Sequence, residues 1–268
     1  MLFARRVGLL ERRLARLPSL LVALSGGVDS AALLGIAARA LPGRVLAATA
    51  RSPAVPFEEV EAAAAAAARL GVPHRVVASH ELEDAAYRAN RGDRCYFCRQ
   101  EMYGVFSRLA KAEGMARIAD GLLADDVDAD RPGVRAAREH GVLHPLREAA
   151  FGKAEARRLA RAWGLDLHDK PAQPCLASRL PIGIVVTEDR LRRVHRAERA
   201  VRALGFREVR VRCEDRHGRI EVGRVELARA RRRRLELEHA VRGAGFRTAA
   251  LDDAGYRMGG AGGAHPGS

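Results

Sequence analysis

The sequence is poor in cysteine and lysine and has no long hydrophobic run. Four cysteines in 268 residues are too few for a disulfide scaffold. No apolar run reaches the roughly eighteen residues that a membrane span requires, and residues 1–18 carry five arginines without a signal-peptide core. We therefore expect a cytoplasmic protein without a membrane segment, long enough for one large domain and a smaller one.

The basic residues are almost all arginine. Only three of the 47 are lysines, and the formal net charge is +14. Arginine suits the recognition of phosphate and carboxylate groups, and a basic surface attracts nucleic acid. However, arginine occurs here together with abundant alanine, including residues 62–68, which is typical of a coding bias toward G and C. On this interpretation most arginines are solvated surface residues, and a nucleic-acid partner is not expected.

A glycine-rich segment follows the first predicted strand. The apolar residues 21–24 lead into Ser25-Gly-Gly-Val-Asp-Ser30, and a helical pattern covers residues 29–40. A strand, turn and helix in this order place free backbone N–H groups at a helix N-terminus, where an anion is favoured. The Walker A spacing is absent, so the sequence predicts a phosphate-binding loop of another kind.

The residue types in this loop suit a phosphate group and a metal ion. Gly26 and Gly27 let the backbone approach a ligand closely, and Ser25 and Ser30 supply hydroxyl groups. Asp29 can bind Mg²⁺. We therefore expect a phosphate group and a divalent cation at these residues.

Strands and helices alternate through the first part of the chain. Predicted strands at residues 44–50, 72–77, 116–119 and 142–146 join the first strand in a five-stranded parallel α/β sheet, with ligands at the carboxyl ends of its strands. At the end of the fourth strand, three carboxylates lie within seven residues. They either bind metal or substrate or serve as turn and cap residues; the three are Asp120, Asp125 and Asp126.

The second part of the chain reads as a smaller α+β unit. Helices are predicted over residues 188–204 and 225–242, and strands over residues 207–213, 219–222 and 247–251. A proline-rich loop precedes them. We therefore expect a nucleotide-binding domain at residues 1–170, an α+β domain at 171–258 and a flexible tail at 259–268.

Three of the four cysteines are candidates for chemistry. Cys95 and Cys98 form a Cys-x-x-Cys motif, which suits zinc, an iron–sulfur cluster or a dithiol couple. Cys175, in the proline-rich loop, is the candidate third ligand. Three thiolates leave one iron of a [4Fe-4S] cluster open to bind a sulfide, whereas zinc would take a histidine such as His168 and form a closed structural site. Cys213 is expected to be a small buried residue.

Arginines and glutamates accompany Cys175. Arg210 and Arg212 alternate on one strand and so share a face, and Arg179 lies four residues after Cys175. If the two domains meet there, these guanidinium groups form a phosphate clamp. Two acidic residues, Glu198 and Glu221, either bind metal or form plain salt bridges with them.

The chain resembles the N-type ATP pyrophosphatases in its Ser25 loop, and from about residue 20 to 258 it resembles the LarE family of ATP-dependent sulfur transferases. The segments that carry this resemblance are Ser25-Gly-Gly-Val-Asp-Ser30, Arg94-Cys-Tyr-Phe-Cys98, Ala124-Asp-Asp126, Arg131-Pro-Gly-Val-Arg135, Pro174-Cys-Leu-Ala-Ser-Arg179, Arg210-Val-Arg212, Arg219-Ile-Glu-Val222 and Leu251-Asp-Asp-Ala-Gly-Tyr-Arg257.

The resemblance implies synthesis of the nickel-pincer nucleotide cofactor of lactate racemase. ATP adenylates one carboxylate of a pyridinium-3,5-dicarboxylate mononucleotide, and a sulfur nucleophile displaces AMP to leave a thiocarboxylate. In family members with only the cysteine that matches Cys175, this residue gives up its own sulfur. Members that also match Cys95 and Cys98 are thought to hold a [4Fe-4S] cluster and to transfer its sulfide.

Further roles follow from the resemblance alone. Arg210 and Arg212 match positions near the substrate phosphate, and Glu198 and Glu221 match acidic positions near the reactive cysteine. Asp125 matches a position at the ATP site. The family also implies a hexamer supplied with sulfide or with a sulfur-donor protein.

Two other functions fit the same residues. A PP-loop tRNA thiolase would also use ATP, three cysteines and a basic surface, although no added RNA-binding domain is visible in the sequence. A zinc-stabilised nucleotide-binding module without turnover would use the cysteines for structure alone.

Overall fold

The computed structural model describes residues 2–126, 132–171 and 173–256. The chain divides into two compact units, one made of Met1–Glu81 and Cys95–Gln173, and the other of Leu82–Arg94 with the residues from Pro174 onward. Arg131 and the predicted tail at 259–268 lie outside the described residues. None of the described helices is both long and apolar enough to cross a membrane.

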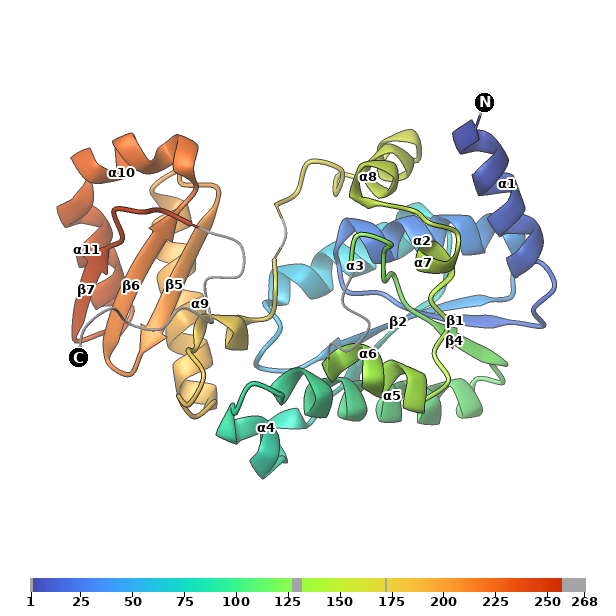
Figure 1. The fold of residues 1–268 in the computed structure, drawn as a ribbon, viewed down its shortest axis with the longest axis horizontal. Coiled ribbons are helices and arrows are strands. Elements are labelled where there is room, and N and C mark those ends of the chain that lie inside the picture. The colour runs from blue at the N-terminus through green and yellow to red at the C-terminus, as the bar shows by residue number, and fades with distance from the viewer. Residues whose placement is uncertain (1, 127–131, 172, 257–268) are drawn as a thin grey trace. The chain divides into compact units, whose positions relative to one another are not determined.

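The first unit is built on a four-stranded parallel sheet (Figure 1). The strand order is β3-β2-β1-β4, and the strands are β1 (Leu20–Ala23), β2 (Val45–Arg51), β3 (His74–Ala78) and β4 (Arg117–Ala119). The prediction of a parallel α/β sheet is confirmed, but a fifth strand is not. Leu143 makes only a single parallel bridge with Ala119, and a short helix, α7 (Pro145–Glu148), begins two residues later. The proline at the first helical position favours that early start.

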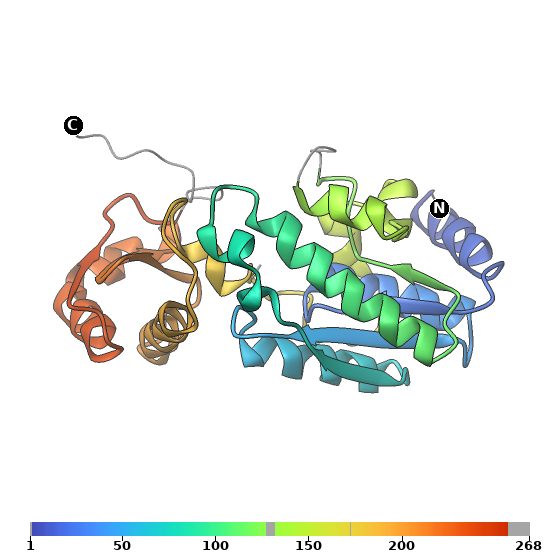
Figure 2. The ribbon, with the colours of Figure 1, turned by 90° about the horizontal axis from the view of Figure 1, so that it is seen from below.

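Helices cover both faces of this sheet (Figures 1 and 2). One face carries α1 (Leu2–Leu14), α2 (Val28–Ala40), α3 (Phe57–Arg69) and α8 (Lys153–Ala162), and the other carries α5 (Arg94–Ala112) and α6 (Pro132–Glu139). Successive side chains of a strand point to opposite faces. Accordingly Leu20 and Val22 pack in the core with α2, whereas Leu21 packs with Tyr103 of α5. The continuous apolar run of the first strand follows from burial on both sides.

The second unit holds a three-stranded mixed sheet in the order β5-β6-β7. Its strands are β5 (Val209–Glu214), β6 (His217–Val222) and β7 (Thr248–Leu251); β5 and β6 are antiparallel, and β6 and β7 are parallel. Two helices pack with it, α9 (Glu188–Ala203) and α11 (Arg234–Gly243). Thr187 is the N-cap of α9, and its hydroxyl accepts a hydrogen bond from Arg190 N at 3.3 Å.

Two segments of the second unit differ from the sequence prediction. The helix expected over residues 225–242 is interrupted at Arg233, which separates α10 (Leu227–Arg232) from α11. In addition, α4 (Ala85–Ala89) lies in sequence between β3 and α5 of the first unit, yet it belongs to the second unit. The Asn90 side chain fixes this segment by donating hydrogen bonds to the carbonyls of Pro181 and Ile184 at 2.7 and 3.0 Å.

The contact between α2 and α8 depends on a glycine, which gives a stability prediction. A Cβ on Gly35 of α2 would lie 2.3 Å from Trp163 Cζ3. We expect Gly35→Ala to lower the free energy of unfolding by about 1–3 kcal/mol, because the ring must shift within a packed core. Urea denaturation of the full chain measures the effect.

Gly104→Ala is the matched control for this prediction. Gly104 also lies inside a helix, α5, but its added Cβ would meet only Arg108 Nη1 at 3.7 Å, an ordinary contact. Replacing it should therefore leave stability unchanged or raise it by up to about 1 kcal/mol. Equal stabilities of Gly35→Ala and the unmodified chain would contradict the packing described for α2 and α8.

Candidate active site

The loop between β1 and α2 lies at the carboxyl end of a central strand. Gly26 has φ +77°, and a Cβ at this position would lie 2.1 Å from the backbone oxygen of Glu59. Gly121, after β4, touches the other side of the loop, since its Cβ would lie 2.6 Å from Ser30 N. Glycine is therefore required at both positions. The loop ends at Gly27, the N-cap of α2, where the first helical N–H groups have no intrahelical partner.

The two loop serines hydrogen bond within the loop itself. Their hydroxyl oxygens lie 3.1 Å apart, and Ser30 Oγ accepts a hydrogen bond from Ser25 N at 3.1 Å. Ser30 Oγ also donates to the carbonyl of Gly27 at 3.1 Å, and the Ser30 side chain is buried. Ser30 thus holds the shape of the loop, while Ser25 is exposed to solvent.

Asp29, the predicted magnesium ligand, is engaged by a lysine. Lys153 Nζ lies 2.9 and 2.7 Å from the two carboxylate oxygens of Asp29. Burial raises the pKa of Asp29, and the hydrogen bond from Lys153 opposes that rise. A cation that binds Asp29 must therefore compete with the Lys153 ammonium group.

A second lysine, Lys170, also contacts the loop. Lys170 Nζ donates a hydrogen bond to the carbonyl of Gly26 at 3.2 Å and forms an ion pair with Glu59 at 2.8 Å. Sequence reasoning missed both Lys153 and Lys170. The rarity of lysine was the available signal, because two of the only three lysines in this arginine-rich chain contact the loop.

The three carboxylates that follow β4 act mainly as anchors and caps. Asp120 accepts hydrogen bonds from Tyr103 Oη at 2.5 Å and from His144 Nδ1 at 2.7 Å. Burial raises the pKa of Asp120, but the bond and the charge of His144 outweigh it, and the net pKa is lowered. Asp125 accepts a bond from Lys153 N at 2.7 Å, and Asp126 accepts one from Leu123 N at 3.1 Å. The contacts of Asp125 and Asp126 are those of cap and turn residues. Binding of metal or substrate by the three carboxylates stays a prediction.

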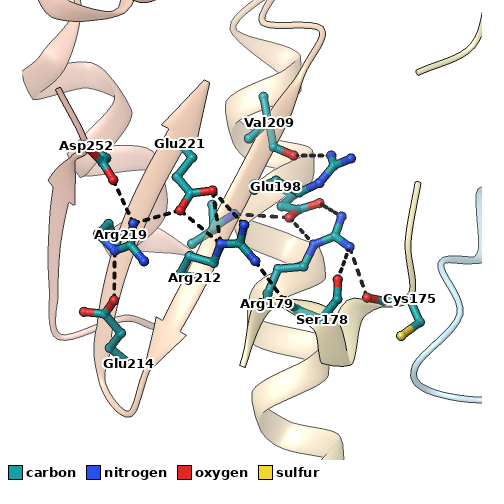
Figure 3. Close-up of polar contacts among 12 residues, drawn as sticks. Cys175, Ser178, Arg179, Glu198, Val209, Arg212, Glu214, Arg219, Glu221 and Asp252 are labelled. Atoms are coloured by element: carbon teal, nitrogen blue, oxygen red, sulfur yellow. Dashed lines mark hydrogen bonds and ion pairs between the residues drawn. The ribbon is translucent and has the colours of Figure 1, made fainter. Parts of the chain in front are cut away.

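In the second unit, Arg179 is buried and connects a glutamate to the backbone around Cys175 (Figure 3). Its Nε and Nη2 donate to the two carboxylate oxygens of Glu198 at 2.7 and 3.0 Å. Its Nη1 donates to the carbonyl of Cys175 at 3.0 Å and to Ser178 Oγ at 3.0 Å. Burial raises the pKa of Glu198, but Arg179 together with the charges of Arg202 and Arg210 more than offsets this, and the net pKa is lowered. This pair fixes the main chain at Cys175.

A second arginine–glutamate pair lies beside the first (Figure 3). Arg212 Nε and Nη2 lie 3.0 and 2.9 Å from the two oxygens of Glu221, and Arg212 Nη1 donates to the carbonyl of Ser178 at 2.8 Å. Arg179 and Arg212 therefore face carboxylates, as in the salt-bridge interpretation of Glu198 and Glu221. A phosphate-binding role for these arginines stays a prediction.

Arg210 has a different environment. Its Nη1 donates to the carbonyl of Val209 at 2.7 Å, and its guanidinium group lies 5.0 Å from the centre of the Tyr256 ring. Burial lowers the pKa of Arg210, and the neighbouring charge of Arg179 lowers it further. A bound anion would offset this cost, so Arg210 suits the substrate phosphate predicted for it.

All four cysteines are thiols rather than disulfides. Cys95 and Cys98 lie one turn apart at the start of α5 in the first unit, Cys95 exposed and Cys98 half-buried. Cys175 belongs to the second unit, is half-buried and precedes a short 3₁₀ helix, η2 (Leu176–Arg179). Cys213 is buried, as predicted, and burial raises its pKa to about 11.

The donor chemistry of Cys95, Cys98 and Cys175 suits iron and sulfide, since all three thiols are at least partly accessible. Among the residues that the structure describes, no three His, Cys, Asp or Glu side chains are grouped as metal ligands. The [4Fe-4S] cluster therefore stays a prediction.

Comparison with known proteins first defines the class of protein to which this chain belongs. The family model for asparagine synthase matches residues 9–167, which include β1, the Ser25 loop and α2, so this is an ATP-using protein of the PP-loop type. The chain is 40% identical over 241 residues to an uncharacterized protein of Synechocystis sp., covering 89% of this chain and 90% of that one. It is 34% identical over 245 residues to the pyridinium-3,5-bisthiocarboxylic acid mononucleotide synthase of Lactiplantibacillus plantarum, covering 89% and 87%. The chain belongs to the LarE family of PP-loop proteins.

The Lys153–Asp29 ion pair gives a prediction about cation binding. In Lys153→Met, a divalent cation no longer competes with an ammonium group for Asp29. We expect the ligand-free Lys153→Met protein to bind Mn²⁺ about fivefold more tightly than the unmodified protein does. This factor corresponds to removal of a neighbouring positive charge worth about 1 kcal/mol. Isothermal titration with Mn²⁺ measures this change.

Lys111→Met is the control, because Lys111 is the third lysine of the chain and is exposed in the same unit. It should bind Mn²⁺ like the unmodified protein. Unchanged or weaker Mn²⁺ binding by Lys153→Met would contradict the assignment of Asp29 as a cation ligand.

Proposed function

We propose that this protein is an ATP-dependent sulfur transferase of nickel-pincer nucleotide synthesis. Its substrate is a pyridinium-3,5-dicarboxylate mononucleotide, and its product carries a thiocarboxylate in place of a carboxylate. The observation that carries the proposal is the Ser25 loop at the start of α2, in a chain that is 34% identical over most of its length to a pyridinium-3,5-bisthiocarboxylic acid mononucleotide synthase.

In the first half-reaction, a substrate carboxylate oxygen attacks the α-phosphorus of ATP. The bond from that phosphorus to the bridging oxygen breaks, pyrophosphate leaves, and an acyl adenylate remains. The backbone N–H groups at the start of α2 and the Lys153 ammonium group, which contacts Asp29, would stabilise the departing negative charge. Asp29 would hold the Mg²⁺ ion that shields the phosphates.

In the second half-reaction, a sulfur nucleophile attacks the adenylated carbonyl carbon and AMP leaves with its electron pair. The carboxylate is unreactive by itself, but AMP is a good leaving group, so the acyl adenylate reacts with a soft nucleophile. We assign the sulfur to Cys175, whose main chain is held by the buried Arg179–Glu198 pair. Arg210 and Arg212 would bind the substrate phosphate, and Glu221 would orient Arg212.

Two sources of the transferred sulfur fit these residues. Cys175 can lose its own sulfur, in which case its Cβ–Sγ bond breaks, the Cα proton leaves and dehydroalanine remains. Alternatively Cys95, Cys98 and Cys175 would together hold a [4Fe-4S] cluster, which when bound supplies sulfide and permits repeated turnover. The sulfide then comes from solution or from a donor protein.

Anaerobic turnover with the dicarboxylated nucleotide and ATP tests the proposal. The unmodified protein should release AMP and pyrophosphate and form thiocarboxylate, whereas Cys175→Ala should still release AMP but form no thiocarboxylate. Cys213→Ala is the matched control, because Cys213 is buried, and it should keep both activities. Thiocarboxylate formation by Cys175→Ala at the normal yield would contradict the role of Cys175.

The same samples distinguish the two sulfur sources. Iron and acid-labile sulfide in the anaerobic protein, lost in Cys95→Ser with Cys98→Ser, would support the cluster. A mass decrease of the spent protein by one molecule of hydrogen sulfide would support sacrifice of Cys175. Zinc without iron or sulfide would exclude the cluster.

A further inference from the structure

We propose that Lys170 is a positioning residue that orients the Gly26–Gly27 peptide for phosphate binding. The proposal rests on the proposed use of ATP at the Ser25 loop. Its basis is one contact: Lys170 Nζ donates a hydrogen bond to the carbonyl of Gly26 at 3.2 Å while it is held by Glu59 at 2.8 Å.

The geometry of the peptide unit makes this contact effective. The carbonyl of Gly26 and the N–H of Gly27 belong to one planar peptide and point in opposite directions. Fixing the carbonyl toward Lys170 therefore fixes the Gly27 N–H toward the other side, where it donates to the exposed Ser25 Oγ at 3.4 Å. Gly26 needs such a restraint, because a glycine is free to rotate its neighbouring peptides where other residues are not.

Glu59 makes the lysine a rigid partner. The Glu59 side chain is buried, with 6% of its surface exposed, so its carboxylate requires a positively charged neighbour. Its backbone oxygen is also the atom that excludes any Cβ at Gly26. One residue of α3 therefore restrains the loop twice, directly through its main chain and indirectly through Lys170.

The chemistry of the contact favours lysine over arginine. An ammonium group is a compact donor of three hydrogen bonds and can serve a carbonyl and a carboxylate in different directions, whereas a guanidinium group is planar and larger. This requirement explains a lysine at position 170 in a chain whose basic residues are almost all arginine.

The test uses pyrophosphate as the ligand, in the presence of Mg²⁺, and the full chain. Lys170→Met and Lys170→Arg should each weaken pyrophosphate binding about tenfold, the effect of losing one well-directed hydrogen bond to a charged group. Glu59→Gln keeps the lysine charge and should weaken binding in the same direction. Lys111→Met should bind normally.

A second measurement separates positioning from simple attraction. The amide resonance of Gly27 in the ligand-free protein should shift in Lys170→Met, whereas that of Gly43, in a turn on the same unit, should not. Normal affinity in Lys170→Arg, or an unshifted Gly27 resonance together with weaker binding, would overturn the positioning role, because Lys170 would then act through its charge alone.

The outcomes also separate this inference from the proposed function. An unmodified protein that does not bind pyrophosphate would overturn both. Pyrophosphate binding that depends on Lys170 in a protein that transfers no sulfur would support the inference and overturn only the proposed function.

Discussion

The close approach of Gly26 to the backbone of Glu59 is the constraint on which the first unit's site depends. A side chain at Gly26 would collide with the Glu59 oxygen at 2.1 Å, and the residue has a positive φ. This packing brings the Glu59 side chain beside the loop, where it requires Lys170 as a partner. The loop is thus held by main-chain contact, by Ser30 within it and by two lysines around it. The N–H groups at the start of α2 are organised before any ligand arrives, so binding costs little reorganisation.

In the second unit, buried charged pairs hold the main chain around Cys175. Arg179 is 0% exposed, and both it and Arg212 form two-point pairs with glutamates while they bond to carbonyls between Cys175 and Ser178. Such pairs contribute little net stability, since desolvation offsets their attraction, but loss of one partner costs about 3–5 kcal/mol. Their role here is to fix the backbone that carries the Cys175 thiol.

Much of the fold follows from the sequence. The periods of two and of about 3.6 residues locate the strands and helices of both units, and the loop at residues 25–30 lies where the pattern predicts. The incorrect secondary-structure predictions have local causes. Residues 142–146 have the apolar pattern of a strand, but Pro145 starts a helix there. The break at Arg233 interrupts a pattern that is otherwise helical. There the Arg233 guanidinium group donates to the carbonyl of Leu204 at 2.9 Å and lies 5.8 Å from the centre of the Phe206 ring.

The site was less predictable, because it depends on pairing between distant residues. Sequence patterns identified Arg179, Arg212, Glu198 and Glu221 but could not show that each arginine faces a glutamate. Likewise Lys153 and Asp29 are far apart in the chain, and only the fold makes them partners.

The transfer of ¹⁸O from the substrate tests the central claim most directly. With both carboxylates of the pyridinium nucleotide labelled, adenylation followed by sulfur attack must leave one ¹⁸O atom in the phosphate of AMP for each thiocarboxylate formed. We expect that stoichiometry from the unmodified protein. Unlabelled AMP, or label found only in inorganic phosphate released with ADP, would contradict activation of the carboxylate at the Ser25 loop.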